Sequence, residues 1–317
     1  MIENFIAQNP LIFHLIITLL SLFILAKSAD MLVYGISNYA KKLGISDYLI
    51  GFLVVSLGTA LPELVASING AFMKQGEIVF GTVIGSNLFK IPLLGIVIFV
   101  AHKIKVNVND IGTAPIMTFL LGILPILLVI DGQLSRFDGL ILLLAYFVYI
   151  INLWKREGEI GKIKESIKLK EIAKESFIFL GALVALLLSA RYLVSSSTEI
   201  SRILNIPMFI VGLLIIGIGA SSPELMVQIR SVLKHHRGIA IGNVLGSIIT
   251  NSTLVLGIVA LLHPVTIVFS NIMFTSIIMS LGILYTLISI FKGMVTKRHA
   301  IILISLYIIS VVIETII

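Results

Sequence analysis

Long apolar stretches separated by short polar connections run through the whole chain of 317 residues. A bilayer core about 30 Å thick requires ~20 apolar residues for each helical span. Because a helix satisfies its backbone hydrogen bonds within its own segment, we expect each stretch to form a transmembrane helix. The pattern predicts ten spans, near residues 10–35, 48–73, 77–101, 112–130, 135–153, 177–200, 207–232, 238–262, 267–291 and 299–316.

The composition also indicates an all-α polytopic membrane protein. Hydrophobic residues make up 58% of the chain and charged residues 12%, compared with roughly 25% charged residues in soluble domains. The absence of cysteine excludes disulfides, thiolate metal sites and cysteine nucleophiles. A net charge of +7 is compatible with nucleic-acid binding. Most of the basic residues lie in the connections between spans, however, so we expect the lipid bilayer as partner and no nucleic acid.

Lysine and arginine are distributed unevenly between the two sets of connections. Connections after odd-numbered spans hold 17 basic residues, whereas those after even-numbered spans hold three, Lys74, Arg136 and Arg202. The positive-inside rule assigns the basic set to the cytoplasm. We therefore expect a multi-pass protein of the cell (plasma) membrane with both termini extracellular.

The two halves of the chain share a repeat at a constant offset of 161 residues. Residues 51–64 match residues 212–225, and residues 81–86 match residues 242–247. Each half holds five spans, and because five is odd the second half enters the membrane from the opposite side. The predicted organisation is two inverted five-helix repeats, residues 1–154 and 177–317, joined by a partly helical cytoplasmic connector, residues 155–176.

Each half carries a glutamate in the middle of an apolar span, Glu63 in the first and Glu224 in the second. An ionisable residue within the membrane is costly and usually marks a functional site. The alternative is a protonated or salt-bridged glutamate that only holds helices together. Two glutamates at symmetric positions favour a shared site at the midplane, where inverted halves meet.

Pro62 and Pro223 precede these glutamates and are expected to interrupt their helices. Proline donates no backbone hydrogen bond and clashes with the carbonyl four residues earlier, which here belongs to Gly58 or Gly219. The freed main-chain oxygens can then face a ligand. Nearby hydroxyls belong to Ser56, Thr59 and Ser221. Carboxylate, carbonyl and hydroxyl oxygens together predict a site for a hard cation such as Ca²⁺ or Na⁺.

A second paired motif contains glycines four residues apart. Gly81 and Gly85, like Gly242 and Gly246, form small-xxx-small faces that favour close helix packing. Each pair is followed directly by a serine. We expect these serines, Ser86 and Ser247, to lie within reach of the glutamates on neighbouring spans.

The paired Gly-[Thr/Ala]-x-x-Pro-Glu and Gly-x-x-x-Gly-Ser motifs resemble the α-repeats of prokaryotic-type sodium/calcium exchangers in the cation/Ca²⁺ antiporter superfamily. The resemblance extends over essentially the whole chain. It implies that spans two, three, seven and eight enclose one central site, with alternating access by sliding of spans one and six. It also implies that Ca²⁺ and Na⁺ compete for the two glutamates. The ligands implied by position are Glu63, Glu224, Thr59, Ser86 and Ser247, with main-chain carbonyls at Ser56 and Gly217.

The chain departs from this family pattern at several positions. The Thr-Ser pair expected in each repeat is Thr59-Ala60 in the first and Ala220-Ser221 in the second. One expected coordinating hydroxyl is therefore missing. The asparagine that the family places after the first glycine of the third span is Thr82 here.

A further departure places a positive charge at the predicted site. Four residues after the third-span serine, where the family has Asn or Asp, this chain has Lys90, and Asn251 occupies the equivalent position as a candidate ligand. Compared with the second repeat, the first lacks one residue between Lys90 and Gly95. An ammonium reduces the formal charge of the two-glutamate site from −2 to −1. At an effective dielectric of about 20, the interaction energy between two unit charges about 4 Å apart is ~4 kcal/mol.

Three interpretations of Lys90 remain open. The ammonium replaces one bound cation, which gives an altered stoichiometry or coupling to H⁺. Alternatively, the side chain points away from the site and snorkels, which leaves ordinary exchange intact. In the third interpretation, the protein has lost Ca²⁺ transport and handles another cation.

These observations predict a secondary active antiporter, not an enzyme, that exchanges Ca²⁺ against Na⁺ by alternating access. We expect inorganic cations as substrates, with Ca²⁺ and Na⁺ (or H⁺) in the site, no cofactor, and a functional monomer. A membrane-embedded hydrolase would need one nucleophile with a positioned base, whereas the repeat duplicates both residue types. An ion channel would usually gather identical subunits around a pore.

Overall fold

The computed structural model describes residues 9–42, 56–101, 103–105, 113–157, 169–221, 224–225, 228–229, 237–292 and 294–316. Helices lie in all ten predicted spans, as an all-α polytopic membrane fold requires. The first half contains α2 (Pro10–Lys42), α4 (Ser56–Thr59), α5 (Leu61–Phe72), α6 (Gly76–Ala101), α8 (Ala114–Leu128) and α9 (Arg136–Glu157).

The second half is divided into more elements along its five predicted spans. It contains α10 (Leu169–Leu204), α11 (Met208–Val211), η2 (Gly212–Ile216), α12 (Gly217–Ala220), α14 (Arg237–Ile249), η3 (Thr250–Val255), α15 (Leu256–Leu262), α16 (Phe269–Phe291) and α17 (Lys297–Ile316). The helix α10 begins at Leu169, so part of the predicted connector is helical. Among the described residues, five helices are by themselves long and apolar enough to cross a membrane.

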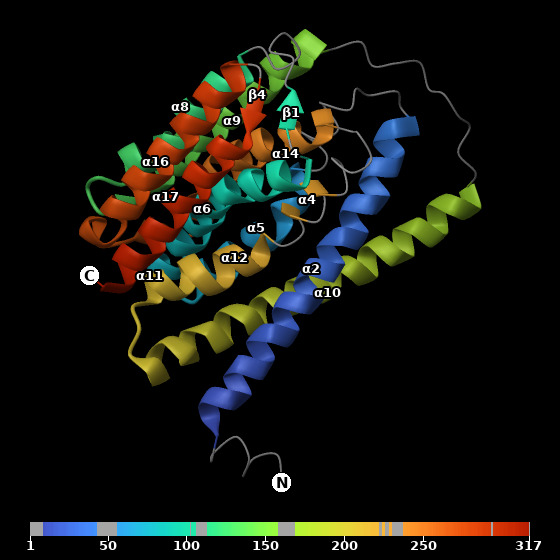
Figure 1. Ribbon diagram of the computed structural model, residues 1–317. Helices are drawn as coiled ribbons and strands as arrows, with labels where there is room; N and C mark the ends of the chain where they lie inside the picture. Colours follow the sequence, from blue (N-terminus) through green and yellow to red (C-terminus); the bar gives the residue numbers. More distant parts are fainter. Residues whose placement is uncertain are drawn as a thin grey trace.

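The helix α6 lies at the centre of the bundle, and α2 lies at its edge. In the 18-residue apolar window of α6, 89% of the residues are buried, compared with 22% in the window of α2. The helices α2 and α10 pack against each other and cross on one side of the other helices (Figure 1). The outer face of α2 exposes Leu19 and Phe23, which is consistent with contact to lipid.

Two short antiparallel strand pairs, which the sequence did not predict, join connections between the helices. The strand β1 (Lys103–Lys105) pairs with β4 (Met294–Thr296), and β2 (Gln133–Leu134) pairs with β3 (Val265–Thr266). Backbone outside helices needs hydrogen-bond partners, and the two connections of each pair meet at one end of the bundle. Each pair joins two connections that the alternation of ten spans places on one side.

The backbone interrupts both motif helices at equivalent positions. A turn at Ala60, with φ −79° and ψ −7°, separates α4 from α5. A turn at Ser221, with φ −82° and ψ 4°, ends α12. These residues are 161 positions apart, so the repeat found in the sequence is also present in the backbone geometry. The predicted interruption before Glu63 is confirmed, whereas Pro223 lies outside the described residues.

The two halves differ in one helical turn that follows the repeated Gly-Ser motif. The π-helix η3 follows α14, whereas α6 is α-helical through the equivalent region and contains Pro92. From Lys90 to Gly95 the first half has five steps, and from Asn251 to Gly257 the second half has six. Because a π turn closes over one residue more than an α turn, η3 accommodates the residue that the first half lacks.

Glycines allow α6 to pack against the second half at the distance of backbone contact. A Cβ atom at Gly81 or Gly85 would collide with the carbonyl oxygen of Phe209 or Leu213, respectively. The approach is reciprocal, because a Cβ atom at Gly212 would lie 2.6 Å from the carbonyl oxygen of Ile78. The close packing predicted for the α6 glycines is therefore confirmed. For Gly242 and Gly246 it stays a prediction.

Candidate functional site

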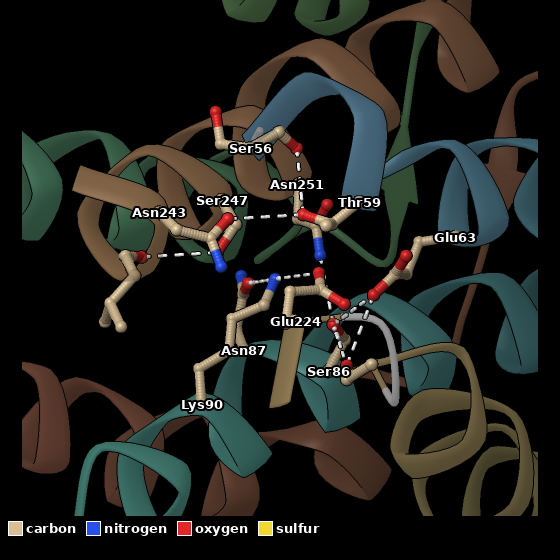
Figure 2. Close-up of polar contacts among 12 residues, drawn as sticks. Ser56, Thr59, Glu63, Ser86, Asn87, Lys90, Glu224, Asn243, Ser247 and Asn251 are labelled. Carbon is tan, nitrogen blue, oxygen red and sulfur yellow. Dashed lines mark hydrogen bonds and ion pairs between the residues drawn. The ribbon is translucent and has the colours of Figure 1, made fainter. Parts of the chain in front are cut away.

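The two repeat glutamates lie in the interior of the bundle. Glu63 is in the first turn of α5, and Glu224 follows the break at the end of α12. Both side chains are 0% exposed. Figure 2 shows Glu63, Glu224 and Ser86 pointing toward one another from different segments. The two repeat glutamates thus share one buried cluster, and its place at the membrane midplane stays a prediction.

Glu63 accepts hydrogen bonds from hydroxyl groups of both halves. Ser86 Oγ donates to Glu63 Oε1 at 2.7 Å, and Ser221 Oγ lies 3.2 Å from the same oxygen. The two hydroxyl oxygens are 2.7 Å apart. Asn251 Nδ2 donates to Ser86 Oγ at 3.1 Å. Ser86, from the first half, thus connects Glu63 to two residues of the second half (Figure 2).

Glu224 faces a positive charge. Lys90 Nζ lies 3.7 Å from Glu224 Oε1, and both side chains are fully buried. The same ammonium is 3.5 Å from Asn87 Oδ1. Asn87 is in turn held by the second half, because its Nδ2 donates to Ser252 Oγ at 2.8 Å. This burial is at odds with a snorkelling Lys90, since the ammonium points inward.

The two main-chain carbonyls predicted as ligands have similar hydrogen-bonding surroundings. The Ser56 carbonyl accepts from the Ala60 amide at 3.0 Å and lies 3.4 Å from Thr59 Oγ1. The Gly217 carbonyl accepts from the Ser221 amide at 3.3 Å and lies 2.9 Å from Ser221 Oγ. Each carbonyl therefore has a hydroxyl beside it. The hydroxyl that the second half lacks at Ala220 is supplied by the next residue.

Thr59 and Ser247 make different kinds of contact. Thr59 Oγ1 is 3.3 Å from Asn243 Oδ1 on α14, so it links the two halves. Ser247 Oγ donates to the carbonyl of Val244 in its own helix at 3.3 Å. Ser247 therefore lies in the same cluster (Figure 2), but its hydrogen bond stays within α14.

Sequence analysis did not select Asn87, Asn243 and Ser252, although all three side chains are fully or almost fully buried. A signal was available, because an amide side chain within an apolar span is itself unusual. Ser252 was harder to find. It follows Asn251 directly, and two neighbouring residues both reach α6 here through the π turn η3.

Several buried acceptor atoms have no hydrogen-bond partner in the part of the chain that the structure describes. Within this cluster they are Glu63 Oε2, Glu224 Oε2 and Asn251 Oδ1, together with Glu224 Oε1, which has only the ion pair with Lys90 at 3.7 Å. Buried polar atoms are normally satisfied, so these oxygens are suited to hold a cation. The described residues contain no group of three or more His, Cys, Asp or Glu side chains that could hold a metal ion. The cluster therefore combines two carboxylates with neutral oxygens.

Known proteins resemble this chain along most of its length. A family model described as sodium/calcium exchanger protein matches residues 13–155 and 174–316. The inner membrane protein YrbG of Escherichia coli K12 is 31% identical over 258 residues, which are 78% of this chain and 79% of that protein. The sodium/calcium exchanger MaX1 of Methanosarcina acetivorans is 28% identical over 326 aligned positions, with 90% of this chain and 93% of that protein covered.

Solved structures of the sodium-calcium exchanger NCX_Mj share the fold. In the structure soaked with 10 mM Na⁺ and zero Ca²⁺, the TM-score is 0.72 at 24% identity, and 95% of this chain and 99% of that chain are covered. The structure soaked with 2.5 mM Na⁺ and 1 mM Sr²⁺ gives a TM-score of 0.71 at 25% identity, covering 94% and 97%. The chain therefore has the ten-span fold of that exchanger.

Proposed function

Because the chain belongs to the sodium/calcium exchanger protein family, and is a multi-pass membrane antiporter for cations and not an enzyme, we propose that it exchanges Ca²⁺ for Na⁺. The exchange takes place at one central site built around Glu63 and Glu224. The observation that carries this proposal is the set of buried carboxylate oxygens without hydrogen-bond partners among the described residues. A cation supplies the interaction that these oxygens lack.

The oxygens around the glutamates suit hard cations that are bound and released in turn. Ca²⁺ takes six to eight oxygen ligands in flexible geometry. Besides the carboxylates, the proposed ligands are the hydroxyls of Thr59, Ser86, Ser221 and Ser247, the Asn251 amide oxygen and the carbonyls of Ser56 and Gly217. A hydroxyl rotates and a carbonyl has two lone pairs, so the present hydrogen bonds do not prevent coordination.

Alternating access follows from the division of this site between the two halves. Ser86 belongs to the first half, and its partners Ser221 and Asn251 belong to the second. A shift of one half against the other would therefore change the ligand set around the glutamates. We place the sliding elements at α2 and α10, which pack together at the edge of the bundle. Because one chain contains both halves, a monomer suffices.

The orientation of the protein belongs to the same proposal. Both termini face outward, because the connections after odd-numbered spans carry most of the lysine and arginine. Cations enter and leave from both sides, and we propose no cofactor beyond the transported ions.

Reconstitution in proteoliposomes tests the coupling directly. Vesicles loaded with Na⁺ and diluted into Na⁺-free buffer are expected to accumulate ⁴⁵Ca²⁺, and dissipation of the Na⁺ gradient should abolish that uptake. If an imposed pH gradient drives uptake in the absence of Na⁺, the coupling ion is H⁺ and not Na⁺. No Ca²⁺ uptake under either gradient would overturn Ca²⁺ exchange and favour a cation exchanger that has lost Ca²⁺ transport.

A further inference from the structure

We propose that the Lys90 ammonium acts as a tethered cation that occupies one monovalent-cation position beside Glu224. The protein then binds and carries one Na⁺ fewer in each cycle than it would with a neutral residue at position 90. This inference rests on the proposed function, because it concerns the number of ions held at the same site. It makes Lys90 a residue that determines ion stoichiometry.

The internal repeat identifies what Lys90 replaces. Lys90 and Asn251 occupy equivalent positions, each four residues after the repeated serine. Asn251 contacts the serine of the other half: its amide donates to Ser86, which in turn donates to Glu63. Lys90 is longer, and its ammonium lies 3.7 Å from the other carboxylate, Glu224. Asn251 therefore contacts the glutamate of the other half through a hydroxyl, whereas Lys90 contacts the glutamate of the other half with its own charge.

The second repeated serine is consistent with this difference. In the first half Ser86 lies between the amide and the carboxylate. Its counterpart Ser247 donates to the carbonyl of Val244 within α14. The direct ion pair between Lys90 and Glu224 leaves this hydroxyl without the bridging role of Ser86. The position beside Glu224 thus has a positive group of the protein where the position beside Glu63 has neutral groups.

The surroundings of Lys90 hold the ammonium in place. Its side chain is 0% exposed, and a cavity of about 10 Å³ borders it, lined by Thr118, Ile248 and Ile283 among others. That volume holds at most about one water molecule, so this cavity offers the side chain no second position of its own size. Asn87 Oδ1 lies 3.5 Å from the ammonium, and the Asn87 amide is anchored to Ser252 at 2.8 Å.

Charge balance gives the consequence for ion binding. Two ionised glutamates carry −2, and the ammonium reduces the site to −1. Opposite charges attract and like charges repel most strongly where water is excluded. A Na⁺ ion beside Glu224 would therefore have to share its carboxylate with a buried like charge. With one fewer bound monovalent ion, the occupied site has the same total charge as a site with a neutral residue at position 90.

Counting bound Na⁺ tests this inference without requiring transport. Equilibrium binding of ²²Na⁺ is measured on the purified full-length protein, on Lys90→Asn and on Lys90→Met. Asparagine reproduces the residue of the second repeat, and methionine keeps the length of the apolar stem. We expect each neutral variant to bind one more Na⁺ per chain than the wild type. Lys90→Arg, which keeps the charge, is expected to bind the wild-type number.

The same variants show the effect on coupling. In proteoliposomes, the Na⁺ gradient at which net Ca²⁺ flux stops at a clamped membrane potential gives the Na⁺:Ca²⁺ ratio. Lys90→Asn is expected to raise that ratio by one. Equal Na⁺ counts in the wild type and in a folded neutral variant would overturn the tethered-cation inference. Absence of Na⁺-driven Ca²⁺ flux in the wild type would instead overturn the proposed function, and the Na⁺ count would still decide the role of Lys90.

Discussion

Ser86 and Ser247 occupy equivalent positions in the two halves of the chain but do not make equivalent hydrogen bonds. Ser86 Oγ donates to Glu63 Oε1 at 2.7 Å and accepts from the Asn251 amide at 3.1 Å. Ser247 Oγ donates to the carbonyl of Val244, 3.3 Å away in the same helix. The first serine thus connects the two halves at the carboxylate, and the second does not.

This asymmetry gives a matched pair of variants. Ser86→Ala removes a buried hydroxyl and leaves the partners Glu63 and Asn251 without their shared group. Leaving a buried polar group unsatisfied costs about 1–3 kcal/mol, so the melting temperature and the rate of Ca²⁺ exchange should both fall. Ser247→Ala should have a smaller effect on both. Equal losses in the two variants would contradict the division of roles, and thermal unfolding with flux assays measures them.

Variants of the two glutamates should differ in thermal stability, although both glutamates are needed for exchange. Glu63→Gln retains an oxygen that accepts from the two hydroxyls, whereas Glu224→Gln leaves Lys90 as a buried charge without its ion-pair partner. Removing one partner of a buried ion pair costs about 3–5 kcal/mol. We expect both variants to lose Ca²⁺ exchange and Glu224→Gln to have the lower melting temperature.

A double variant checks the cause of that loss. Adding Lys90→Met to Glu224→Gln removes the unpaired charge and should recover much of the stability, without recovering exchange. The control is Glu199→Gln, because Glu199 forms a partly exposed ion pair with Arg202 outside the cluster. Exposed pairs contribute about 0–1 kcal/mol. If the double variant is no more stable than Glu224→Gln, the ion pair is not the reason for the difference.

Because α6 packs closely against the second half, we expect one added methyl group at this contact to destabilise the protein. A Cβ atom at Gly85 would collide with the carbonyl oxygen of Leu213, and backbone cannot rotate away. Overpacking typically costs about 1–3 kcal/mol or more, so Gly85→Ala should lower the melting temperature. Gly181 in α10 has no atom within 4 Å of an added Cβ. Gly181→Ala should be neutral or stabilising by up to ~1 kcal/mol, and an equal loss in both variants would contradict the packing argument.

The two ends of α9 test the predicted orientation. Arg136 and Lys155 are exposed near opposite ends of this helix, and the chain has no cysteine of its own. With a membrane-impermeant maleimide on intact cells, Arg136→Cys should be labelled from outside. Lys155→Cys should be labelled only after the membrane is permeabilised. Labelling of Lys155→Cys in intact cells would reverse the predicted topology.

Helix positions and the repeat could be predicted because they depend on local sequence. Each span needs only enough apolar residues to cross the bilayer, and a proline before Glu63 interrupts its helix wherever that helix packs. The offset of 161 residues that aligns the motifs also aligns the turns at Ala60 and Ser221. The short strand pairs could not be predicted, because each joins connections more than 100 residues apart.

The sequence by itself determined the ten spans, the two repeated halves and the equivalent positions of the two glutamates. Only the tertiary structure decided that Ser86 contacts Glu63, that Ser247 bonds within its own helix, and that Lys90 points to Glu224. These contacts depend on the rotation and the longitudinal position of packed helices. They are set by the backbone contact of Gly85 with Leu213 and by the π turn η3, where one residue more changes which side chains face the site.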